Sequence, residues 1–177
     1  MSDDKRYVGI IADGGTDREI LARTAQVCLG DSCEVIDLRR QSLRDTIDEY
    51  WKVRKDDDTS GAQREVAKTV LGVLVAGLGD FENRIPRAAK ASDVLILATD
   101  AERHFIRDSQ YFEPWAWRLI SSAYLGIERF VHGQVLQGRT CDYIPLITLF
   151  IPFPSTDVFV AAVRAEPVRG LRAMDLK

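Results

Sequence analysis

The sequence is poor in the residue types that build disulfide frameworks and zinc sites. It holds three cysteines, Cys28, Cys33 and Cys141, and only two histidines among 177 residues. An odd number of cysteines without metal-type spacing predicts reduced, mostly structural thiols. Reduced cysteines are typical of cytoplasmic proteins, so we expect a cytoplasmic location.

Long apolar runs are also missing. No stretch of about 18 consecutive apolar residues occurs, which is the length that a membrane-spanning helix requires. Residues 1–6 are polar and lead directly into an apolar run, so the apolar central region of a secretory signal is lacking. We therefore predict a soluble protein with no membrane partner.

Two kinds of nucleotide site have no support in the sequence. There is no GxGxxG pattern and no Walker-type lysine motif, which weakens a dinucleotide or P-loop interpretation. The formal net charge is −3, so the chain has no overall basic field that would attract nucleic acid. Any contact with DNA or RNA must then come from a local site.

Apolar runs of strand length alternate with helical patterns. Four runs are bounded by turn residues and predict buried strands at residues 7–12, 33–38, 93–99 and 143–151. Helical patterns are found at residues 16–29, 42–50, 62–78 and 158–164, and Pro86 predicts a short further helix. This alternation predicts an α/β fold, an open and mostly parallel sheet with helices on both faces.

The chain is expected to form one domain over residues 1–177, because its length suits a single core. Residues 105–135 are rich in aromatic side chains and look like a helical insertion. Such a segment more often supplies core or an oligomer contact than a base-stacking surface, so a homo-oligomer or a protein partner is a candidate.

Two acidic clusters follow two of the predicted strands. The first reads Asp13-Gly14-Gly15-Thr16-Asp17 after residues 8–12. Gly14 and Gly15 allow a sharp turn and a close approach of phosphate or metal, and Thr16 or Asp17 can cap the helix that follows. A role as helix cap would by itself explain Asp17. A purely structural role is harder to find for Asp13, because it directly follows a buried strand.

The second cluster reads Thr99-Asp100-Ala101-Glu102-Arg103 after residues 93–98. Asp100 and Glu102 alternate along an extended segment, so both side chains can point the same way. Ligands of open α/β sheets bind outside the carboxyl ends of the strands, and converging carboxylates suit a hard divalent cation. We therefore expect Asp13, Asp100 and Glu102 to converge at one end of the sheet.

These two clusters, in this order, resemble the TOPRIM domain of topoisomerases, primases and small bacterial nucleases. Asp13-Gly14 stands where the family has an acidic residue, usually glutamate, followed by glycine, and Asp17 stands at the start of the next helix. Asp100-Ala101-Glu102 is similar to the family's Asp-x-Asp, with glutamate in the second place. The resemblance covers roughly residues 7–103.

The resemblance implies phosphoryl transfer assisted by Mg²⁺ or Mn²⁺, most simply a small nuclease acting on DNA or RNA. Asp100 and Glu102 would hold the metal, and Asp13 would act as a general acid or base or as a ligand for a second ion. Arg103 and Asp17 are the further catalytic candidates. Asp157 is similar in position to an additional acid that small proteins of this family often have, but a helix cap explains it better.

Two alternatives stay open. An α/β enzyme could bind a phosphorylated small molecule at the N-terminus of the first helix, near Gly14, Gly15 and Thr16. A TOPRIM-like interaction or regulatory module could also have kept the shape and lost the chemistry. Both carboxylate exchanges, at Asp13 and Glu102, favour this second alternative slightly.

Overall fold

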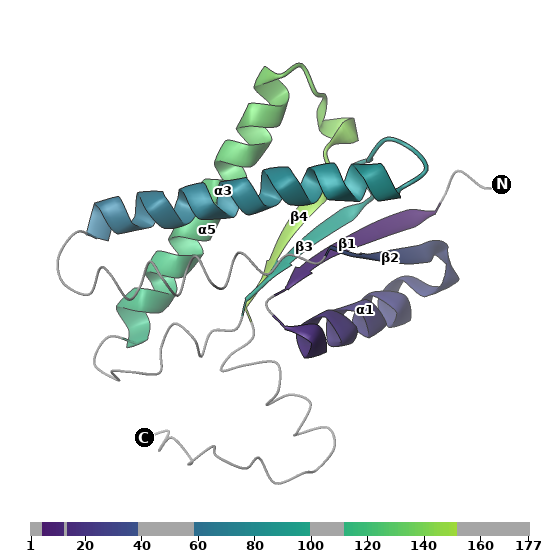
Figure 1. Ribbon diagram of the computed structural model, residues 1–177, viewed down its shortest axis with the longest axis horizontal. Coiled ribbons are helices and arrows are strands. Elements are labelled where there is room, and N and C mark those ends of the chain that lie inside the picture. The colour runs from purple at the N-terminus through teal and green to yellow at the C-terminus, as the bar shows by residue number, and fades with distance from the viewer. Residues whose placement is uncertain (1–4, 13, 39–58, 100–111, 152–177) are drawn as a thin grey trace, which may run out of the picture.

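A four-stranded, entirely parallel sheet forms the centre of the molecule (Figure 1). The structure is a computed structural model and describes residues 5–12, 14–38, 59–99 and 112–151. The strands are β1 (Arg6–Ala12), β2 (Cys33–Asp37), β3 (Val94–Ala98) and β4 (Leu146–Phe150), arranged in the order β2-β1-β3-β4. The predicted open α/β fold is confirmed.

Helices cover the sheet from both sides. Helix α1 (Gly15–Leu29) packs on one face, whereas α3 (Thr59–Arg84) and α5 (Phe112–Leu136) lie on the other (Figure 1). Two short 3₁₀ turns, η1 (Gly30–Ser32) and η3 (Cys141–Tyr143), precede β2 and β4. No described helix is both long enough and apolar enough to cross a membrane.

The strands form where continuous apolar runs were predicted. Strand β1 is buried over Tyr7–Ala12, and the side chains of Val8 and Ile10 pack towards α1. Those of Tyr7 and Ile11 enter the larger core under α3 and α5. Burial on both faces is what a central parallel strand requires, and it explains why no polar residue interrupts this run.

Helix α1 begins one residue earlier than predicted, and its predicted cap is wrong. Gly14 occupies the cap position in extended conformation, and no side chain makes a capping hydrogen bond. Glycine is accepted at this position, and Asp17 then lies in the first turn, where a negative charge is favourable. The end of the helix is as predicted, because Gly30 has a φ of 64°, which other residues rarely adopt.

Helix α3 is longer than the predicted 62–78 and continues to Arg84 despite its four glycines. Gly77 is buried against the sheet, where a Cβ atom would come within 2.4 Å of Ile11 Cδ1. Gly79, two residues later, is exposed and has nothing within 4 Å of that position. Gly77 therefore allows the helix to approach β1 closely, whereas Gly79 has no such role.

The segment between α3 and β3 forms an ion-paired turn instead of the short helix predicted at Pro86. Asp93 is fully buried and accepts two hydrogen bonds from Arg87, at 2.7 and 2.8 Å. It also accepts bonds from the backbone N–H groups of Tyr7 and Lys90. The guanidinium of Arg87 further stacks 4.9 Å above the Tyr7 ring, so this turn connects the starts of β1 and β3.

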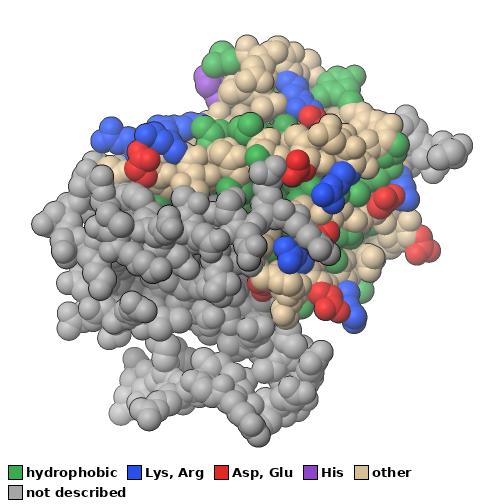
Figure 2. Space-filling model, in the orientation of Figure 1, with side chains coloured by type: hydrophobic (Ala, Val, Ile, Leu, Met, Phe, Trp, Pro, Cys, Tyr) green, Lys and Arg blue, Asp and Glu red, His purple; other side chains and the backbone are tan. Residues whose placement is uncertain are grey.

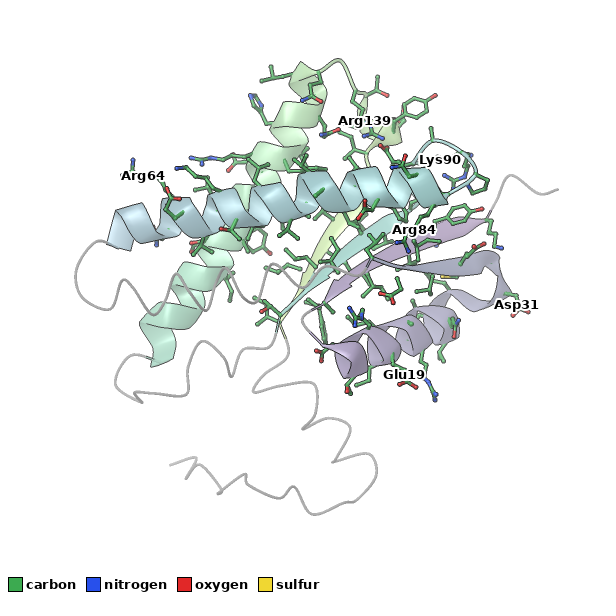
Figure 3. All side chains as sticks on the ribbon, in the orientation of Figure 1. Glu19, Asp31, Arg64, Arg84, Lys90 and Arg139 are labelled. Atoms are coloured by element: carbon green, nitrogen blue, oxygen red, sulfur yellow. The ribbon has the colours of Figure 1, made fainter. Side chains whose placement is uncertain are left out.

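Two further contacts position the long helices. Arg84, at the end of α3, donates a hydrogen bond of 2.8 Å to the backbone carbonyl of Asp37 at the end of β2 (Figure 3). Arg139, which follows α5, pairs with Glu82 of α3 and donates a hydrogen bond to Gln134. The core side chains of α5 include the buried Ala123 and Phe130, so part of the aromatic segment is core, as predicted.

The Asp93→Asn variant should lose about 3–5 kcal/mol of unfolding free energy at pH 7, because it removes the buried partner of the partly buried Arg87. Burial alone raises the pKa of the Asp93 carboxyl, but the bonds from Arg87, Tyr7 and Lys90 outweigh it and hold that pKa below its ordinary 3.8. The stabilisation is therefore complete above pH 3.8 and disappears as pH falls through the lower, folded-state pKa.

Urea unfolding of the wild type and variant at pH 7 and near pH 2 measures this effect. The stability difference should shrink at the lower pH. The matched control is Asp31→Asn, at an exposed position in η1, which should change stability by less than about 0.5 kcal/mol. A loss as small as that of the control at pH 7 would contradict the assigned role of Asp93.

The Gly77→Ala and Gly79→Ala variants should have opposite effects. Alanine at position 79 improves helix propensity in open space and should stabilise the protein by about 0.5–1 kcal/mol. Alanine at position 77 clashes with Ile11 and should destabilise it by about 1–3 kcal/mol. Thermal and urea unfolding of both variants tests this, and equal shifts of the same sign would contradict the close packing of α3 on β1.

Candidate functional site at the carboxyl edge of the sheet

Strands β1 and β3, which precede the two acidic clusters, are direct neighbours. Their register pairs Val8 with Val94 at one end and Ala12 with Ala98 at the other. Because both strands run in the same direction, their carboxyl ends lie at the same edge of the sheet (Figure 1). Asp13 directly follows Ala12 in the sequence, and Asp100 is the second residue after Ala98.

The chain adds its strands to the sheet in two directions from β1: β2 lies on one side of β1, and β3 lies on the other. From β1 the chain crosses to β2 through α1 on one face, and from β2 it returns past β1 to β3 through α3 on the other. The crevice between two strands whose connections leave to opposite faces is where open α/β sheets bind ligands. Here those two strands are β1 and β3.

The described part of the first cluster surrounds the start of α1. Gly14 follows β1, Gly15 begins the helix, and Thr16 is exposed in its first turn. Asp17 is only 8% exposed, and its carboxylate folds back over Gly14, where a Cβ atom would meet Oδ2 at 2.6 Å. The helix N-terminus favours this buried charge, and the carboxylate lies beside the residue that follows Asp13.

The other predicted site residues lie outside the described residues. These are Asp13, Asp100, Glu102, Arg103 and Asp157. Thr99, the residue before Asp100, is described: it is buried, and its N–H donates a hydrogen bond of 3.2 Å to the carbonyl of Phe150. The chain thus leaves β3 from a fixed position beside β1 and β4, while the convergence of the three metal-site carboxylates stays a prediction.

Two charged residues at this edge were missed by the sequence reasoning. Asp37 ends β2, and its Oδ1 lies 3.6 Å from Nε of Arg18 in the first turn of α1. A partial signal was available, since Asp37 is an acidic residue that follows the apolar Val35 and Ile36 within the predicted strand. Arg18 gave no signal, because only the packing of α1 on β1 and β2 directs it towards the edge.

A hollow of about 280 Å³ lies beside the start of α1. Its lining combines backbone and an arginine from α1 with apolar strand residues and two carboxylates, namely Ile10, Gly15, Arg18, Glu19, Ala22, Val35 and Asp37. Figure 3 places Glu19 on the outward side of α1. The hollow is thus continuous with the edge at which the first acidic cluster begins.

A larger hollow of about 700 Å³ lies between α3 and α5 and is chemically poorer. Its described lining is mainly apolar and hydroxyl-bearing, with one carboxylate, at Glu128. We regard the smaller hollow as the better candidate site, because charged groups of both signs meet there at a strand end.

On the face shown in Figure 2, the charges of the described residues do not point to a second site. Basic and acidic side chains of these residues are interspersed there. Asp93 lies at the amino edge of the sheet, and its carboxylate accepts hydrogen bonds from Arg87 and from two backbone N–H groups. Within the described residues, no three His, Cys, Asp or Glu side chains are grouped closely enough to hold a metal ion.

Comparison of the chain with protein-family models, curated proteins and solved structures found no match. The functional argument therefore depends on the residues and geometry of this chain alone.

The Gly14→Ala variant should be less stable than Gly15→Ala by about 1–2 kcal/mol. Both changes reduce the conformational freedom of the unfolded chain, which by itself stabilises by about 0.4–1 kcal/mol. At position 14 the new Cβ atom also displaces the buried carboxylate of Asp17, whereas at position 15 the nearest atom is the Arg18 guanidinium at 3.9 Å. Urea unfolding compares the two variants, and equal stability would contradict the described placement of Asp17.

Proposed function

We propose that this chain is a TOPRIM-like enzyme that transfers phosphoryl groups with the help of Mg²⁺ or Mn²⁺, acting on nucleic-acid phosphodiesters. The observation that carries the proposal is the pairing of Ala12 with Ala98 between neighbouring parallel strands. This pairing puts the carboxyl ends of both strands at one edge, which supports a common site for the two acidic clusters that follow them in the sequence. Without it, the resemblance in the two short motifs would have no common site.

The residues of this edge fit a hard divalent cation. Such ions take oxygen ligands, and Mg²⁺ is usually held by one or two carboxylates together with water. We assign Asp100 and Glu102 as the holding carboxylates, with Asp13 as the general acid or base or as a ligand of a second ion. When bound, the metal would neutralise charge on the scissile phosphate and lower the pKa of a coordinated water.

The chain's own groups would position the phosphate. The backbone of Gly14 and Gly15 opens α1, whose N-terminus favours an anion. Arg18, in the same helical turn, borders the hollow beside Gly15, and its guanidinium can bind phosphate through two parallel hydrogen bonds. Arg103, next to Glu102, is the corresponding candidate from the second cluster. Asp17 would hold the turn over Gly14 and so keep the backbone in place.

The hollow beside α1 supports a second candidate function, the binding of a phosphorylated small molecule. Its volume of about 280 Å³ is close to the lower limit of pockets that hold small ligands, which is about 300 Å³. Gly15 and Arg18 would bind the phosphate, and no metal would be needed. The same experiment separates the two functions.

Calorimetric titration with Mn²⁺ and Mg²⁺ tests the site, and labelled single- and double-stranded DNA and RNA test the activity. We expect the wild type to bind metal at millimolar ion or below and to cut one of these polymers. Asp100→Ala/Glu102→Ala should lose both properties. The matched control is Asp56→Ala/Asp57→Ala, which removes two carboxylates from a charged stretch that we do not assign to the site.

Each outcome has a distinct meaning. Equal loss in the control variant would show that overall charge, rather than the site, holds the metal. Metal binding without cleavage would support the site and reject the nuclease. Absence of metal binding, with calorimetric binding of a sugar phosphate that Arg18→Ala abolishes, would replace the proposal by the small-molecule function.

A further inference from the structure

Strand β4 is the last strand of the sheet and pairs only with β3 (Figure 1). The N–H of Leu146 and the carbonyl of Phe150 form hydrogen bonds of 2.8 and 3.2 Å with the residues that flank β3. Because the backbone groups of successive residues point to alternate sides of a strand, those of Ile147 and Leu149 point away from β3. Within the described residues, no strand pairs with this outer side of β4.

The two edge strands of the sheet differ in charge. Strand β2 carries acidic residues, and its Glu34 pairs with Lys5 at 2.7 Å. Strand β4 reads Leu-Ile-Thr-Leu-Phe and carries no charge. Proteins usually protect an exposed edge with charged side chains, proline or a covering element, because its unpaired backbone groups otherwise bind another strand. The β2 edge is protected by charge, whereas the sequence of β4 itself favours pairing.

Strand β4 also exposes apolar side chains beside this edge. Leu146 is 58% exposed and Phe150 is 36% exposed. Thr148 lies between them on the same face and is exposed as well. On the opposite face Ile147 and Leu149 pack against the core under α3 and α5. A second strand at the outer edge would therefore gain both backbone hydrogen bonds and contacts with large apolar side chains.

We propose that β4 pairs antiparallel with β4 of a second copy of this chain, across a twofold axis at Thr148. The strand is self-complementary in this arrangement. Leu146 lies opposite Phe150 of the second copy, and Thr148 lies opposite its own equivalent. Such apolar and threonine pairs stabilise neighbouring antiparallel strands. Since β4 carries no charge, no like charges meet along the paired strands.

The backbone of β4 fits the same axis. The outward groups of Ile147 and Leu149 form the hydrogen-bonded pairs, so Thr148 becomes a non-hydrogen-bonded pair with Cα atoms about 4.5 Å apart. Pro145 precedes the strand and has no N–H, so the ladder ends there. A twofold contact uses up this edge in both copies, and the charged β2 edge does not extend the sheet further, so the product is a closed dimer. The inference does not depend on the proposed phosphoryl transfer.

Sedimentation equilibrium of the full-length chain over a wide range of protein concentration tests the dimer. The mass of the wild type should approach twice 19.9 kDa as the concentration rises. Thr148→Lys and Thr148→Glu each place like charges opposite one another at the axis, and each should raise the dimer Kd at least about tenfold. An equimolar mixture of the two variants should restore the dimer. The matched control is Val27→Lys, at a position on α1 that is 84% exposed, which should leave the Kd unchanged.

Disulfide crosslinking tests the register of the two strands. Thr148→Cys and Val27→Cys are compared in a background in which the three native cysteines are replaced by serine. A Cα separation of about 4.5 Å lies within the range of about 4.4–6.8 Å that a disulfide requires, so mild oxidation should link two chains through position 148 and not through position 27. A monomer at every concentration, a dimer that withstands both charges at position 148, a mixture that stays monomeric, or equal crosslinking at both positions would overturn the proposal.

Discussion

The buried carboxylate of Asp93 is the constraint on which the arrangement of the sheet depends. It accepts hydrogen bonds from Arg87 and from the backbone of Tyr7 and Lys90, so it holds the starts of β1 and β3 together. A parallel pair has no hairpin to set its register, because its strands are far apart in sequence. The register fixed at the amino edge then determines which residues meet at the carboxyl edge, where Ala12 lies opposite Ala98.

The buried ion pair of Asp93 and the candidate site therefore lie at opposite ends of the strands. At the amino edge the buried charges are paired, and the ring of Tyr7 packs against the guanidinium of Arg87. At the carboxyl edge Gly14 and Gly15 lead from β1 into α1, and Asp37 lies 3.6 Å from Arg18. Such a division is common in α/β proteins, where loops carry function and a rigid sheet positions them.

Strands β1 and β3 could be predicted because each is a continuous apolar run, which is typical of a strand buried on both faces of a parallel sheet. Contacts between distant residues could not be predicted in the same way. Gly77 reduces helix propensity, yet the helix continues, because the packing of α3 on Ile11 outweighs a loss of about 1 kcal/mol. The role of Asp93 also had no local signal, since Tyr7 lies 86 residues away. Of the candidate site, the sequence predicted the edge at which it lies but missed Arg18 and Asp37, whose positions depend on how α1 packs.

The central position of β1 has a consequence for the order in which the protein is made. This strand is synthesised first, but both its neighbours in the sheet come later, and its contact with Asp93 spans 86 residues. At a synthesis rate of about 5–20 residues per second, the apolar run of β1 waits on the order of 4–17 s for β3 to be made. During that interval α1 and β2 are made first and α3 follows, so these three elements have to cover the apolar run of β1 before β3 is available.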